Sequence, residues 1–202
     1  TVKTLEAASI PFVERDGTCL VTLKTGLKVG LYGMVYYHLD RQAMESAIAD
    51  LEDQGADLII IAPHWGVEGS YRPTQEQIDL AHAAIDAGAD IVWGSHPHVL
   101  QPIEEYGDGL ILYSMGNFCF GGNGAPEDLD TVLIQQEVVK TPDGRVSLGQ
   151  RKVVPCSVGS VPGKNNYQPT PLDVDSEDYS RVLQKLEGTF LGPNLKIRKI
   201  GK

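Results

Sequence analysis

The sequence predicts an α/β fold with a parallel βαβ core and a C-terminal antiparallel hairpin. The apolar run Leu58–Ala62, an amphipathic helical stretch and a second apolar run, Asp90–Trp93, follow one another within about 35 residues, as in a crossover between parallel strands. Further on, Thr131–Val139 and Arg145–Val154 are rich in strand-forming residues and flank a Thr-Pro-Asp-Gly turn. These two segments predict the hairpin.

The elements ahead of this core are short. They are a helix over Val2–Ala8, strands over Cys19–Leu23 and Val29–Tyr32, a loop over Tyr36–Asp40 and a helix from Ala43 that Gly55 ends. The first helix has no cap in front of it, so we expect the chain to begin within a helix.

The crossover helix has the clearest start signal in the chain. Thr74 and Gln77 have the spacing of a capping box, and Ile78, Ala81 and Ile85 form an apolar stripe. Further elements are a strand over Leu110–Tyr113, a long loop over Pro155–Pro171 and a last helix that Ser176 caps. We expect residues 1–172 to form one domain part, followed by a C-terminal helix and basic tail over residues 173–202.

Composition excludes several classes of protein. The chain has 202 residues, 42% of them hydrophobic, but no apolar stretch long enough for a membrane span and no signal peptide or anchor. A net charge of −10 argues against nucleic acid binding. The lone cysteines Cys19, Cys119 and Cys156 form no C-x-x-C pair, which argues against a cysteine zinc site.

Three of the 5 histidines follow predicted strands. His64 comes after the first run of the crossover, and His96 and His98 come after the second. Neighbouring parallel strands end at the same edge of a sheet, and imidazole is a common metal ligand, so a shared metal site is expected. Pro97 favours an extended backbone that would turn both rings to one side. The alternatives are a histidine pair that caps a strand and a His64 that packs on Trp65.

Other polar residues near these loops have more than one interpretation. Glu68 is either a general acid or base, a partner that orients an imidazole, or a solvated carboxylate. Arg72 either binds an anionic ligand or lies on the surface, and Asn117 either binds metal or phosphate or ties down its loop. His82 is expected to pack within the helix layer, and His38 is a weaker site candidate.

The order of these motifs resembles a known family. The chain resembles the bacterial capsule synthesis proteins of the CapA, or poly-γ-glutamate, type, a branch of the calcineurin-like metallophosphoesterases. The resemblance extends from Leu5 to Pro171. It rests on Pro63-His64-Trp65-Gly66-x-Glu68, Gly94-x-His96-Pro97-His98, Gln101-Pro102 and Tyr113-Ser114-x-Gly116-Asn117-Phe118.

The resemblance implies a metallophosphoesterase-like α/β sandwich with two divalent metals, Mn, Fe or Zn. It makes His64, His96 and His98 metal ligands. From the residues themselves, we take His98 and Glu68 as catalytic candidates and Arg72 and Asn117 as substrate-binding candidates. The early motifs Asp-x-His, Gly-Asp-x-x-Asp and Gly-Asn-His are absent. The chain therefore resembles the C-terminal half of the catalytic domain and is expected to hold at most one metal, weakly.

Two functions follow from this resemblance. One is a metal-dependent hydrolase in capsule biosynthesis, complete only with the missing N-terminal half and acting on a phosphoester or polymer-linked substrate. The other is a non-catalytic cell-envelope module that handles an anionic capsule polymer. A structural zinc site is a third possibility, against which the glycine-rich loops argue. The family implies an extracellular or envelope location and other capsule-synthesis proteins as partners.

Overall fold

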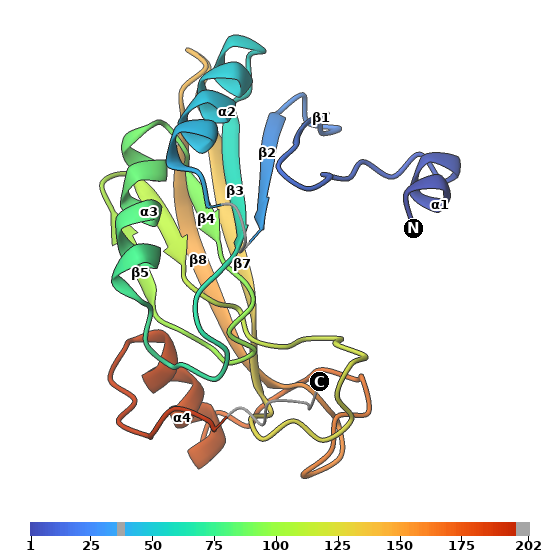
Figure 1. Cartoon of the computed structure of the whole chain (residues 1–202), viewed down its shortest axis with the longest axis vertical. Coiled ribbons are helices and arrows are strands. Elements are labelled where there is room, and N and C mark those ends of the chain that lie inside the picture. The colour runs from blue at the N-terminus through green and yellow to red at the C-terminus, as the bar shows by residue number, and fades with distance from the viewer. Residues whose placement is uncertain (36–38, 197–202) are drawn as a thin grey trace.

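The computed structural model describes residues 1–35 and 39–196. The expectations for His38 and for the basic tail beyond residue 196 lie outside these residues. Figure 1 shows two packed sheets with helices on the outer face of one of them. Within the described ranges, no helix has the length and apolarity that crossing a membrane requires.

The larger sheet has six strands in the order β1-β2-β3-β4-β6-β5. Strands β2, β3, β4 and β6 run parallel, and the edge strands β1 and β5 are antiparallel to their neighbours. The strands are β1 (Thr18–Thr22), β2 (Lys28–Val35), β3 (Leu58–His64), β4 (Ile91–Trp93), β5 (Ile103–Tyr106) and β6 (Gly109–Leu112). The parallel crossover from β3 to β4 is confirmed.

The helices α2 (Arg41–Asp53) and α3 (Gln75–Asp86) begin at side-chain caps. The Asp40 carboxylate accepts hydrogen bonds from the first turn of α2, so this helix begins two residues earlier than the apolar spacing indicates. The capping box of Thr74 and Gln77 is confirmed. The short helix α1 (Val2–Ala7) buries none of its residues.

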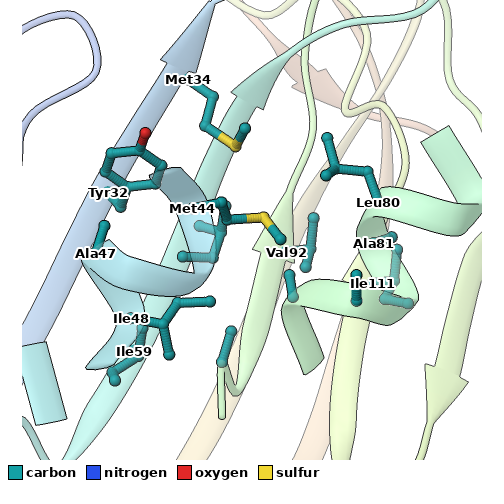
Figure 2. Packing of buried hydrophobic residues seen from close by; sticks show 14 of the residues in the cluster. Tyr32, Met34, Met44, Ala47, Ile48, Ile59, Leu80, Ala81, Val92 and Ile111 are labelled. Carbon is teal, nitrogen blue, oxygen red and sulfur yellow. The ribbon is translucent and has the colours of Figure 1, made fainter. Parts of the chain in front are cut away.

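One apolar core lies between these two helices and the larger sheet, as Figure 2 shows. In α2 the buried positions are the predicted ones, Met44, Ala47, Ile48 and Leu51. In α3 they are Gln77, Leu80, Ala81, Ala83 and Ala84, whereas the predicted Ile78 and Ile85 are only partly buried at the margin. The face of α3 that carries the small alanines can lie close to the sheet. This face is therefore the buried one, and the larger Ile78 and Ile85 lie at its margin.

The second sheet covers the opposite face. It consists of β7 (Asp130–Lys140), β8 (Val146–Ser157) and β9 (Thr170–Pro171), all antiparallel, so the predicted hairpin is confirmed. Its Ile134 and Leu148 pack on residues of β4 and β6. The helix α4 (Glu177–Leu186), capped by Ser176, lies at the lower end of the sheets in Figure 1.

Two strands were not predicted from the sequence. β5 lies at the edge of the larger sheet, beside β6, and contains Glu104 and Glu105. Charged residues are common in edge strands, and here they interrupt the apolar pattern by which a strand is predicted. β9 has two residues and was assigned to the long loop before α4. Neither difference moves the histidine loops.

Candidate metal centre

The ends of β3 and β4 bring His64 and His96 together. A parallel bridge joins His64 to Ser95, one residue before His96. The Ser95 N–H donates to the Pro63 carbonyl at 3.0 Å, and the Trp65 N–H donates to the Ser95 carbonyl at 3.0 Å. The two loops therefore leave the sheet at the same level, as the parallel crossover predicts.

The rings of His64 and His96 meet edge to edge through one pair of nitrogens. His64 Nε2 lies 3.0 Å from His96 Nδ1, and the ring centroids are 4.6 Å apart. On its other side, His64 Nδ1 lies 3.1 Å from Ser95 Oγ, whose own hydrogen is directed at the Pro63 carbonyl. Ser95 then accepts from Nδ1, so His64 Nε2 carries the lone pair that a metal needs.

The prediction of an extended backbone for the His96-Pro97-His98 segment is wrong. His96 has φ 103° and His98 has φ 59°, both in the left-handed region that residues other than glycine rarely adopt. The local preference that Pro97 imposes is overcome by the fixed loop ends and by a hydrogen bond of 2.7 Å from the Gly69 N–H to the Pro97 carbonyl. Such backbone strain is typical of functional sites.

Asn117 holds His98 at two points. The Asn117 Oδ1 lies 2.7 Å from His98 Nδ1, and its Nδ2 donates to the His98 carbonyl at 3.1 Å. Because the Asn117 oxygen can only accept, His98 Nδ1 carries the hydrogen and Nε2 is left as the available ligand atom. The His98 ring centroid is 6.3 Å from that of His96 and 4.9 Å from that of Phe120.

The charges around the pair favour neutral imidazoles. Burial, and next the nearby His96 and His98, lower the pKa of His64 below its ordinary value, against the opposing effect of Glu68. Burial also lowers the pKa of His96, which Glu68 again opposes. Neutral imidazole is the metal-binding form, and the half-buried Glu68 is near enough to act on both rings.

Arg72 and His82 are bound to groups outside the histidine centre. The Arg72 guanidinium donates to the Phe190 carbonyl at 3.2 Å and lies 3.5 Å from Asn194 Oδ1. His82 is stacked on Tyr106 at 3.8 Å and bonded to Glu104 at 2.9 Å, so it packs α3 against β5 and takes no part in this centre.

A buried amide network that the sequence did not reveal supports the loops. Gln77 Nε2 donates to Gln101 Oε1 at 3.0 Å, and Gln101 Nε2 donates to the Ser70 and Arg72 carbonyls at 2.9 and 3.2 Å. Both glutamines are buried. The only signal in the sequence was Gln101 in its Gln-Pro pair; Ser95 and Gly69 gave none.

The distance between His64 Nε2 and His96 Nδ1 is that of a hydrogen bond, and it can also be compared with the spacing of two ligands on one metal ion. Two nitrogens each about 2.1 Å from a metal, at a right angle, are about 3.0 Å apart, which is the separation seen here. In the described part of the chain, however, no group of three or more His, Cys, Asp or Glu side chains is arranged to hold a metal ion. The described residues thus bring His64 and His96 into contact, with His98 beside them.

Known proteins share this architecture and parts of this sequence. The calcineurin-like phosphoesterase YfkN from Bacillus subtilis superposes on 81% of this chain and 61% of its own with a TM-score of 0.51 and 19% sequence identity. That likeness concerns the fold alone. It confirms the predicted metallophosphoesterase-like α/β architecture.

The sequence relatives are more specific. The PGA biosynthesis protein CapA of Bacillus subtilis is 37% identical over 131 residues, and the capsule biosynthesis protein CapA of Bacillus anthracis is 44% identical over 90 residues. These matches cover 65% and 45% of this chain but 31% and 22% of the relatives, so the chain spans about a third or less of their length. The profile of the family described as bacterial capsule synthesis protein PGA_cap matches residues 6–122, more than half of the chain. The chain belongs to the bacterial capsule synthesis family PGA_cap.

Proposed function

We propose that this chain contributes one wall of a metal-dependent, phosphoesterase-like hydrolase site to poly-γ-glutamate-type capsule biosynthesis. The observation that carries the proposal is the contact of 3.0 Å between His64 Nε2 and His96 Nδ1 at the carboxyl edge of a parallel sheet. A metal ion would replace the hydrogen between these atoms. His98, with Nε2 available, would bind a second metal, and side chains from elsewhere in a longer protein or from a partner would complete both.

In such a site a pair of divalent metals, Mn, Fe or Zn, activates water for attack on a phosphate ester. His64 and His96 would hold one metal in the neutral state that burial favours. Asn117 would fix the ring of His98. Glu68 would accept or deliver a proton at the edge of the site, and Arg72 would reach an anionic substrate only by leaving the Phe190 carbonyl.

The second candidate is a non-catalytic module that handles an anionic capsule polymer in the cell envelope, alongside other capsule-synthesis proteins. The observation that favours it is the absence, in the described ranges, of a three-ligand group. The net charge of −10 means that such a polymer would need a local cationic site, which a bound metal could provide.

Calorimetric titration of the chain with Mn²⁺ and Zn²⁺ tests the proposal. We expect binding that His64→Ala and His96→Ala each weaken roughly tenfold or more. His82→Ala is the matched control, because that histidine lies against Tyr106, outside the centre. Absence of binding by the wild-type chain, or equal affinities of the wild type and His96→Ala, would sink the metal site. Binding of poly-γ-glutamate without metal and without phosphodiester hydrolysis would favour the second candidate.

A further inference from the structure

The segment after α4 lies against the loop that carries Glu68. We call residues 188–196 the C-terminal clamp and residues 66–72 the Glu68 loop. The Leu195 N–H donates to the Gly69 carbonyl at 2.9 Å, and the Tyr71 N–H donates to Asn194 Oδ1 at 3.0 Å. The clamp thus satisfies two backbone groups of the loop.

Gly69 connects the clamp to the histidine loop. Its carbonyl accepts from Leu195, while its N–H donates to the Pro97 carbonyl at 2.7 Å, between His96 and His98. A displacement of Gly69 would therefore reach the strained segment that presents both imidazoles. The same loop is also held by the buried Gln101, whose amide donates to the Ser70 and Arg72 carbonyls.

The clamp is itself anchored by a buried charge cluster. The Tyr71 and Phe190 rings meet edge to face at 4.8 Å, with Lys185 Nζ 4.7 and 5.1 Å from their centroids. Lys185, only 2% exposed, donates to Asp128 and Asp130 at 2.7 Å each. Phe190, near the start of the clamp, is thereby held close to Asp130 of the smaller sheet. This anchoring allows Asn194, near the end of the clamp, to hold the Glu68 loop in place.

We infer that Asn194 is a positioning residue for the histidine centre: through Tyr71 and Gly69 it fixes the Glu68 loop and the His96-Pro97-His98 segment relative to each other. The family profile ends at residue 122, about 70 residues before the clamp. The effect on metal affinity rests on the proposed function, whereas the effect on the loops does not.

Amide hydrogen exchange with Asn194→Ala tests this. The Tyr71 N–H loses its acceptor directly, but the Gly69 N–H is bonded to Pro97 and reports only a transmitted effect. We expect exchange at Gly69 to rise at least threefold while the core amide of Ile111 is unchanged. Asn194→Asp keeps the acceptor oxygen and should restore protection. Leu191→Ala, at a side chain that is 90% exposed in the same segment, is the matched control.

The second readout is the affinity for Mn²⁺ or Zn²⁺. We expect Asn194→Ala to weaken it roughly tenfold, at the low end for residues that orient metal ligands, and Asn194→Asp to recover it. Faster exchange at Tyr71 alone, with Gly69 exchange and affinity unchanged, would overturn the inference, as would equal effects of Leu191→Ala or equally accelerated core exchange. If the wild type binds no metal, the proposed function fails, and the Gly69 amide still decides the role of Asn194.

Discussion

Asn117 Oδ1 lies 2.7 Å from His98 Nδ1, and the same side chain donates to the His98 carbonyl. This double contact fixes the ring, its tautomer and the left-handed backbone at once. Asn117 is buried, and both ends of its amide are used by these two contacts with His98.

Asn117→Ala should release His98. We expect the Nδ1–H tautomer of His98 to lose its dominance, because only the Asn117 oxygen requires it. The free energy of unfolding should fall by about 1–3 kcal/mol, since a buried carbonyl loses its donor. Imidazole ¹⁵N chemical shifts and urea unfolding measure the two effects. Phe118→Ala, at an exposed neighbouring ring, should change neither, and an unchanged tautomer in Asn117→Ala would contradict the assignment.

Gly94→Ala should be among the most damaging small substitutions. A β-carbon there would stand 2.6 Å from Trp65 Nε1 and closer still to the Tyr113 carbonyl, two groups that are hydrogen-bonded to each other at 2.9 Å. We expect a loss of about 3 kcal/mol in the free energy of unfolding, because neither backbone nor the buried indole can move aside. Gly121→Ala, which meets nothing within 4 Å, is the control. Equal unfolding curves for the two variants would disprove this close packing.

Lys185→Met should destabilise the chain although it adds apolar surface. It would leave the buried Asp128 carboxylate without the cation that now pairs with it, although the Asp130 N–H would still donate to its Oδ1. Removing one member of a buried ion pair costs about 3–5 kcal/mol. Urea unfolding measures the loss. Lys152→Met, at an exposed lysine on β8, should lie within about 0.5 kcal/mol of the wild type.

Stability should fall in acid through Asp130. Burial alone would raise the pKa of this carboxyl, but the hydrogen bonds from Arg181 and the charge of Lys185 outweigh burial and lower it below the ordinary 3.8. The unfolded chain therefore takes up the proton first as the pH falls. The stabilisation is fully present above about pH 5 and is lost as the pH drops through the folded-state pKa.

Asp130→Asn provides the check on this pH dependence. The charged groups that face Asp130 are Arg181 and Lys185, with Asp128 on the other side of Lys185. The variant should be less stable at pH 7 but should lose less of its remaining free energy of unfolding between pH 5 and pH 3 than the wild type. Parallel curves for the two proteins over this range would exclude the proposed contribution.

The sequence revealed most where a local pattern decides the structure. Alternating and continuous apolar runs predicted the parallel crossover and the hairpin, and the Thr74–Gln77 spacing predicted a real capping box. The meeting of His64 with the histidine loop followed from topology, because parallel strands end at one edge.

The rest depended on interactions between distant residues. The left-handed φ angle of His96 runs against the preference that Pro97 imposes on the residue before it, and contacts from the Glu68 loop outweigh that preference. Asn194 contacts Tyr71 across 123 residues, so no sequence window could contain the pair. The sequence did not indicate β5 because Glu104 and Glu105 are atypical of a buried strand; β5 lies at the edge of the sheet, beside β6.

The long separation in sequence between Tyr71 and Asn194 also sets the order in which parts of the fold can form during synthesis. The crossover strands and helices lie within the first 112 residues and can pair early during synthesis. The Tyr71 amide acquires its acceptor only after 123 further residues have been made. The histidine loops should therefore reach their final arrangement last, after the sheet that carries them has formed. In nascent chains stalled before Asn194 is made, this would appear as protection of the Ile111 amide without protection of the Tyr71 and Gly69 amides, and equal protection of all three would exclude such an order.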